Sequence, residues 1–293
     1  MTFSRGGWQE ARGGDIGGKG GRGHPQDYFV ENVFEELDDQ REYYFNRTTS
    51  TLFWRPANGT SPTALRRGDL VAPALETLLK VSADYVRFEG LQFAYTLPTY
   101  MQPYEPTSGG DWAVHRGAAT MIENATGVVF DSCVWQHIEG NGVMLSHYVR
   151  DSKLTNSEIS GAGDTPVVLL GSADLMDGRA GSQPWHNEIS HNYLHHFGAW
   201  GRQAAGYFEG LAGKNNVSFN VIHDGPRAGA NFNDGFGGGL NFEGNLLFNV
   251  VQDTGEHGDS LCLCLCLCLS RSRSLPLSVC LSVCLSVCLC VST

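Results

Sequence analysis

The sequence predicts an all-β protein wound as a parallel β-helix, because one short phrase recurs along it at coil-like spacing. The phrase is an apolar residue, two small or polar residues, an asparagine, any residue and a second apolar residue. Strict copies begin at Ile189, Val217 and Phe242, and looser copies begin at Phe88, Phe130 and Leu154.

The spacing and pattern of the phrases predict the form of each coil. Successive copies start 42, 24, 35, 28 and 25 residues apart, and coils of roughly 20–30 residues with insertions at turns are typical of solenoids. The alternation of apolar and polar residues indicates strands. The recurring asparagine is expected to adopt a left-handed turn and to hydrogen-bond with its counterparts in neighbouring coils.

Residues 1–69 are expected to precede the solenoid. The glycine-rich stretch 1–27 is predicted to be a loop, since no strand precedes its glycines and no Lys–Ser/Thr pair follows them. Residues 31–38 predict a short helix, and residues 42–45 and 51–54 predict an aromatic hairpin. The coils are predicted over residues 70–260, with insertions at 96–110 and 172–185.

Residues 261–293 form a low-complexity tail that alternates Cys-Leu and then cycles Ser-Val-Cys-Leu. A simple DNA repeat translates into this pattern, whereas metal sites use cysteine pairs separated by defined turns. We interpret the tail as translated repeat DNA that leaves the last coil uncapped. The ninth cysteine, Cys133, takes the asparagine place of its phrase and is expected to be a small buried side chain.

Composition limits the partners and the location. A net charge of −11 argues against nucleic acid and anionic membranes as partners, and no apolar run is long enough to predict a transmembrane helix. No signal peptide is recognisable in this chain. Four glycosylation sequons nevertheless favour an extracellular full-length protein, which we expect to be a monomer without a cofactor or metal. The sequons are at Asn46, Asn58, Asn124 and Asn216.

Two segments resemble the pectin-lyase-like superfamily of right-handed parallel β-helix proteins. Residues 31–54 resemble the ENvxEELD…EWY…TLY segment that precedes the coils, and residues 223–238 resemble an HDxPRxG…DGxGG segment. The resemblance implies a right-handed parallel β-helix acting on a polysaccharide or oligosaccharide, and it is greatest to the glycosidase-like branch with xylosidase and fucosidase activities. Residues 6–9 resemble a GGFQ stretch that usually lies well inside such proteins. The resemblance starts at residue 5 and breaks near Gly258, so the chain is interpreted as a fragment.

Three carboxylates are candidates for glycoside hydrolysis. Glu209, Asp234 and Glu256 lie 25 and 22 residues apart, about one coil each, and side chains one coil apart on one face stack roughly 4.8 Å apart. Hydrolysis needs two carboxylates about 5–9.5 Å apart. We assign Asp234 as nucleophile or base and Glu256 as acid/base, with Glu209 and Asp224 in reserve. Each can equally be a solvated loop residue or a turn cap.

Other residues are candidates for substrate binding. His223 and Arg227 are expected to bind sugar hydroxyls or a carboxylate, and Asp224 is a further candidate for substrate binding. Trp112 either forms one wall of a sugar site, together with Tyr95, Tyr100 and Tyr104, or anchors the first insertion. His195 and His196 do not predict a metal site, because adjacent residues of a strand point to opposite faces.

Two alternative functions remain open. A polysaccharide lyase would use Arg227 as base, with Ca²⁺ held by Asp224 and Asp234. A catalytically silent β-helix would bind carbohydrate or serve a structural role.

Overall fold

The computed structural model describes residues 30–59, 61, 66, 70–107, 112–172, 181–233 and 238–253. The chain divides between Ala72 and Pro73 into two compact units, which are described separately. The predicted loop at 1–27 and the tail at 261–293 lie outside the described residues. Within the described ranges no helix is long and apolar enough to span a membrane.

The first unit is a 3₁₀ turn packed on a hairpin. Its elements are η1 (Phe34–Glu36), β1 (Tyr43–Asn46) and β2 (Thr51–Trp54), with β1 and β2 antiparallel. The Phe34 ring meets the rings of Tyr44 and Phe53 edge-on at 5.2 and 5.4 Å. The hairpin prediction is confirmed, but the predicted helix at 31–38 is only a single turn, because Val33 is already extended.

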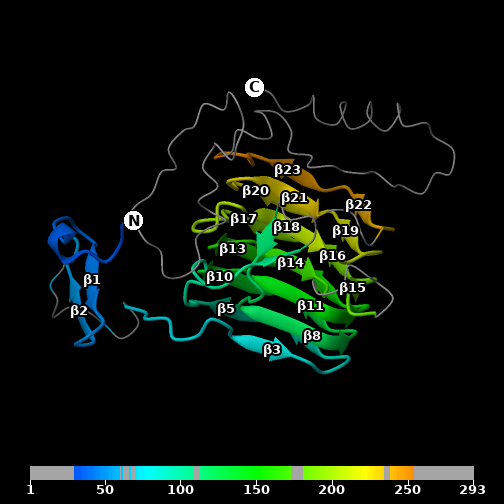
Figure 1. Cartoon of the computed structure of the whole chain (residues 1–293), viewed down its shortest axis with the longest axis horizontal. Coiled ribbons are helices and arrows are strands. Elements are labelled where there is room, and N and C mark those ends of the chain that lie inside the picture. Colours follow the sequence, from blue (N-terminus) through cyan, green and yellow to red (C-terminus); the bar gives the residue numbers. More distant parts are fainter. Residues whose placement is uncertain are drawn as a thin grey trace. The chain divides into compact units, whose positions relative to one another are not determined.

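The second unit is a parallel β-helix of three sheets through which the chain cycles coil after coil (Figure 1). Sheet I contains β3 (Leu79–Val81), β8 (Thr120–Thr126), β11 (Val143–Arg150), β14 (Val167–Leu170), β18 (Ala205–Gly210) and β21 (Ala228–Asn233). Sheet II contains β4 (Arg87–Glu89), β9 (Val129–Asp131), β12 (Lys153–Thr155), β16 (Glu188–Ser190), β19 (Asn216–Ser218) and β22 (Asn241–Glu243). Sheet III contains β5 (Gln92–Ala94), β10 (Val134–Ile138), β13 (Glu158–Ala162), β17 (Tyr193–His195), β20 (Val221–His223) and β23 (Leu246–Phe248).

The six phrases lie in register, as the sequence predicts. The first apolar residues form one column of sheet II: Phe88, Phe130, Leu154, Ile189, Val217 and Phe242. The second apolar residues form one column of sheet III: Phe93, Trp135, Ile159, Leu194, Ile222 and Leu247. Both columns point inward and build the core together with the inner face of sheet I. Burying these side chains supplies the main driving force for coil stacking.

The asparagines form a ladder inside the corner between sheets II and III. Asn192 Nδ2 and its backbone N–H donate to Asn220 Oδ1, and Asn220 repeats the same two bonds to Asn245. The ladder continues through Ser157 to Cys133, whose side chain is fully buried as predicted.

The left-handed residue of this corner is not the asparagine, so that part of the prediction is wrong. Positive φ occurs one residue earlier in every coil, at Gly90, Ser132, Asn156, His191, Phe219 and Gly244. The asparagine instead satisfies backbone groups that the turn leaves without strand partners.

The first insertion covers the outer face of sheet I. It carries β6 (Glu105–Pro106) and β7 (Ala113–Val114), an antiparallel pair. Trp112 and Val114 pack in a second apolar cluster with Met144, Val168 and Phe208. The second insertion carries β15 (Pro184–Trp185), which pairs with β11.

The ladder gives a stability prediction. Asn220→Ala removes the acceptor for two donors of Asn192 and the donor to the Ile189 carbonyl. Each buried polar group left unsatisfied costs about 1–3 kcal/mol, so we expect a loss of about 2–4 kcal/mol in urea-induced unfolding. The control is Asn241→Ala, an exposed asparagine with one bond to Asn216, which should change stability by less than about 0.5 kcal/mol. Equal losses would contradict the ladder's role.

Candidate functional site

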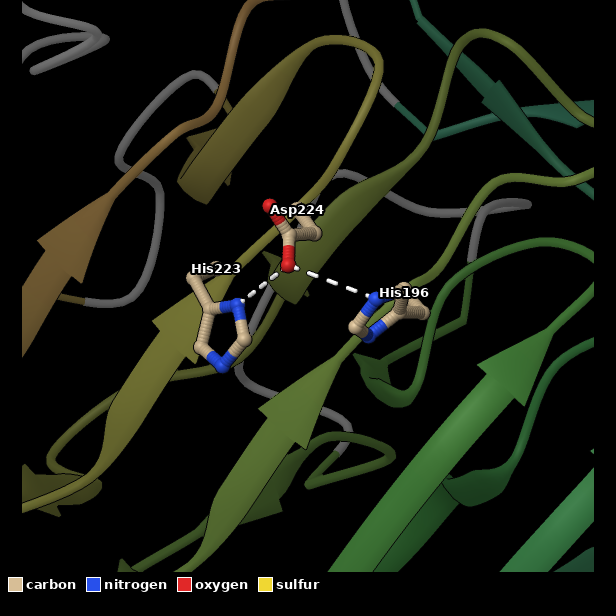
Figure 2. Close-up of side chains that lie close together, drawn as sticks. All are labelled: His196, His223 and Asp224. Carbon is tan, nitrogen blue, oxygen red and sulfur yellow. Dashed lines mark hydrogen bonds and ion pairs between the residues drawn. The ribbon is translucent and has the colours of Figure 1, made fainter.

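A histidine–aspartate cluster lies where the chain leaves sheet III at the ends of β17 and β20 (Figure 2). At this corner the second residue after each inward apolar residue has positive φ: Tyr95, His137, Gly161, His196, Asp224 and Asn249. The turn at His196 ends the strand alternation, and His195 Nδ1 lies 2.7 Å from His196 Nδ1. The expectation that these two rings point to opposite faces is therefore wrong.

Asp224 is at the centre of the cluster. Its Oδ2 lies 2.7 Å from His223 Nδ1 and 3.4 Å from His196 Nε2, and its Oδ1 accepts a hydrogen bond from Asn249 Nδ2. Partial burial raises the pKa of this carboxyl, but the hydrogen bonds from Asn249 and His223 outweigh it and lower the pKa below its ordinary value. Asp224 is therefore an ionised carboxylate at neutral pH.

The imidazole of His223 is fixed in orientation. Only 6% of His223 is exposed, and its ring stacks between His195 at 5.3 Å and Phe248 at 4.5 Å. Its Nε2 lies 2.8 Å from the Tyr193 hydroxyl.

His195 links the cluster to a second carboxylate. Its Nε2 lies 3.1 Å from Glu158 Oε1. Burial, with help from the neighbouring imidazoles of His196 and His223, lowers the pKa of His195 despite the opposing effect of Glu158. His195 is therefore neutral at pH 7.

An open groove of about 590 Å³ runs beside the cluster along the outer corner between sheets II and III. Tyr193 and Glu158 belong to both the groove and the cluster. Tyr193 and Phe219 are 41% and 53% exposed, and Phe219 stacks on His191 at 5.2 Å. The groove is lined by Ser132, Cys133, Val134, Asn156, Ser157, Glu158, His191, Asn192, Tyr193, Phe219 and Val221.

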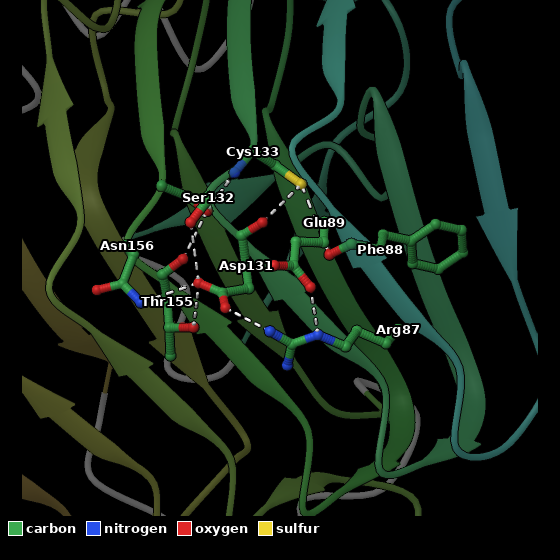
Figure 3. Close-up of polar contacts among 9 residues, drawn as sticks. Arg87, Phe88, Glu89, Asp131, Ser132, Cys133, Thr155 and Asn156 are labelled. Carbon is green, nitrogen blue, oxygen red and sulfur yellow. Dashed lines mark hydrogen bonds and ion pairs between the residues drawn. The ribbon is translucent and has the colours of Figure 1, made fainter.

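A polar network around Asp131 lies at the end of the groove that Ser132 and Asn156 line (Figure 3). Asp131 accepts hydrogen bonds from Asn156 and Ser132 and pairs with Arg87 at 2.5 Å. The hydrogen bond from Asn156 is the largest of the effects that lower the pKa of Asp131. The bonds from Arg87 and Asn156 to Asp131 join three successive coils, and Arg87 also pairs with Glu89 of its own strand.

Glu209 lies inside the coils. It is 5% exposed, accepts a hydrogen bond from the Tyr207 hydroxyl at 2.6 Å and lies 3.3 Å from Asn215 Nδ2. Through Asn215 it ends a second amide ladder that continues to Asn187 and Ser152. Its partner in the next coil is Phe232; Asp234, on which Glu209 was expected to stack, lies outside the described residues.

The remaining predicted residues are spread over the molecule. Asp234 and Glu256 lie outside the described residues. Trp112 is 3% exposed and packs against Phe208, and the Arg227 guanidinium lies 4.6 Å from the Trp112 ring centre. The Trp112 ring therefore anchors the first insertion.

The predicted glycosylation sites also differ in exposure. Asn58 and Asn124 are exposed. Asn46 accepts hydrogen bonds from the Thr48 and Thr49 N–H groups, and Asn216 bonds to Ser218 and Asn241.

The sequence reasoning missed His195, His196 and Tyr193 as members of one site with His223 and Asp224. A signal was present, because the left-handed corner always follows the second apolar residue of the phrase by two positions. Applying that count to Leu194 and Ile222 places His196 and Asp224 at equivalent corners of adjacent coils.

Comparison with known proteins supports the fold. No model of a known protein family matches the chain, and no curated protein matches it. A solved structure described as "Glycoside hydrolase" superposes with a TM-score of 0.64 at 19% sequence identity. The match covers 75% of this chain but only 45% of that protein. At this identity the likeness extends to the β-helix fold, and this chain spans less than half of the longer protein.

Glu209 gives a prediction on pH and stability. Burial raises its pKa from 4.5 to about 7, although the bonds from Tyr207 and Asn215 act in the opposite direction. The folded state therefore holds a proton that the unfolded state has already released. Stability from this group is fully present below about pH 4.5 and is lost as the pH rises to about 7. One pKa unit is about 1.4 kcal/mol, so the full loss is about 3 kcal/mol.

The test is Glu209→Gln, which keeps the shape of the protonated acid. In urea unfolding, the variant should match the native protein near pH 4.5 and be more stable above pH 7. Glu243→Gln, at an exposed position of β22, should leave the pH profile unchanged. A profile of Glu209→Gln that parallels the native one would show that Glu209 does not titrate in this range.

Proposed function

We propose that the protein binds a polysaccharide or oligosaccharide along the outer corner of sheets II and III and hydrolyses its glycosidic bonds. The observation that carries the proposal is the ionised Asp224, held between two imidazoles beside a groove with exposed aromatic rings. Sugars present hydroxyl groups and apolar ring faces, and this arrangement complements both.

The contacts available to a sugar come from a few residues. Asp224 and Glu158 accept hydrogen bonds from hydroxyls, while the exposed imidazole of His196 donates or accepts according to tautomer. The exposed rings of Tyr193 and Phe219 offer apolar faces for sugar rings. The likeness to a structure described as a glycoside hydrolase supports a scaffold on which such chemistry is found.

We propose Asp234 and Glu256 as the catalytic carboxylates, with Asp224 binding substrate. In such a pair one carboxyl group protonates the glycosidic oxygen, while the other attacks the sugar or activates water. Residues 252 and 253, shortly before Glu256, support the assignment of Glu256 because they lie beside the turn at Asp224. The N–H groups of Gln252 and Asp253 donate to the carbonyls of Gly225 and Pro226.

We also propose that the full-length protein is secreted, with glycans on Asn58 and Asn124. Both are exposed sequon asparagines, and their modification requires passage through the secretory pathway.

The test is cleavage of a panel of aryl glycosides and oligosaccharides by the full chain, measured as released reducing ends. Asp234→Asn and Glu256→Gln should each lower kcat by about 10²–10⁴-fold, the usual contribution of a positioned acid or base. Asp224→Asn should mainly raise KM, because it removes a binding contact. The control Asp151→Asn, an exposed residue that also has positive φ, should behave like the native protein.

Two other outcomes would contradict hydrolysis. Unsaturated products that absorb in the ultraviolet would identify a lyase. Saturable glycan binding without any cleavage would identify a carbohydrate-binding β-helix.

A further inference from the structure

We propose that His196, His223 and Asp224 form a site for one divalent transition-metal ion of the Zn²⁺ class, with the fourth coordination position open to water. The proposal stands independently of glycan hydrolysis, because it rests only on the geometry of these three side chains. Two imidazoles and one carboxylate, with an open position, form a ligand set that zinc takes at catalytic sites.

The ligand atoms lie near the spacing that an ion would need. One nitrogen or oxygen from each residue lies within 4.8 Å of the other two, and Asp224 Oδ2 is 3.4 Å from His196 Nε2 and 2.7 Å from His223 Nδ1. Zinc–ligand bonds of about 2.0–2.2 Å in a tetrahedron place ligand atoms roughly 3.3 Å apart. The His223–Asp224 contact must open by about 0.6 Å, and the imidazole nitrogens of His196 and His223 lie within 4.8 Å of each other.

The proton arrangement also suits metal binding. With the ion on His196 Nε2, the Nδ1–H of His196 donates to His195 Nδ1, and the Nε2–H of His195 donates to Glu158. With the ion on His223 Nδ1, the Nε2–H of that ring donates to the Tyr193 hydroxyl. The free oxygen of Asp224 is held by Asn249. Every ligand thus has the outer partner that fixes its orientation and raises its basicity at metal sites.

One ligand of the cluster is held in place by packing, while the other two are accessible to solvent. The His223 ring is locked between His195 and Phe248, whereas the His196 side chain is 64% exposed and Asp224 is 25% exposed. An ion can therefore enter from the side of His196 and meet two ligands that need little reordering. Imidazole ligands favour zinc and its neighbours over Ca²⁺ or Mg²⁺, which prefer oxygen.

The site is confined to two adjacent coils. The equivalent corner residue of the preceding coil is Gly161 and that of the following coil is Asn249, and neither carries an imidazole or a carboxylate. His137 lies one coil beyond Gly161. Among the described residues this is the one group of three metal-ligating side chains that converge, so we expect a stoichiometry of one ion per chain.

The test is calorimetric titration of the tag-free full chain with Zn²⁺ after treatment with a chelator. Accessible thiols are first alkylated, because the eight cysteines of residues 262–290 would compete for zinc; Cys133 is fully buried. The native chain should bind one ion. His196→Ala should weaken binding by more than the roughly 10–100-fold that loss of an outer partner causes.

Two further variants separate ligation from general structural effects. His191→Ala is a matched control, since His191 is also exposed with positive φ but lies outside the cluster, and it should bind zinc like the native chain. Tyr193→Phe keeps all three ligands but removes the partner of His223, so it should weaken binding about 10–100-fold. Co²⁺ should give the intense visible absorption of a four-coordinate site. Failure of the native chain to bind, or equal binding by His196→Ala and His191→Ala, would overturn the proposal.

Discussion

The asparagine ladder is the constraint on which the coil shape depends. A sharp corner between sheets II and III requires one residue per coil with positive φ, and such a turn interrupts the regular pairing of backbone groups. The stacked amides of Asn192, Asn220 and Asn245 restore these bonds inside the corner. Because an unpaired buried amide is costly, each coil must place its asparagine directly over the next. The inward apolar columns on either side then fall into register without further specification.

The same logic explains how much of the fold the sequence could predict. The phrase contains both apolar columns and the ladder residue, so its period defines the register of sheets II and III. It says nothing of sheet I, because the segment between phrases varies in length. For that reason the inward direction of Glu209, and its pairing with Phe232, could not be obtained from residue counts alone.

The histidine–aspartate cluster was harder to predict for a different reason. The first corner repeats asparagine at the ladder position of its last three coils, but the second corner accepts Tyr95, His137, Gly161, His196, Asp224 and Asn249 in turn. Packing of the sheets, rather than local preference, imposes the left-handed conformation there. Because no particular residue type is needed at the second corner, functional side chains can occupy it. In two adjacent coils, this corner brings imidazoles and a carboxylate together.

Asp224 and Glu209 show how the position of a carboxyl group on the coil decides what it does. Glu209 lies in the interior, where burial raises its pKa to about 7 and its bonds to Tyr207 and Asn215 terminate a ladder. Asp224 lies at an outer corner, where Asn249 and His223 keep it ionised. An ionised carboxylate beside two imidazoles attracts either sugar hydroxyls or a cation. Carbohydrate is proposed for the groove between sheets II and III and the metal ion for the next corner, where the chain leaves sheet III; Tyr193 lines the groove and its hydroxyl bonds to His223.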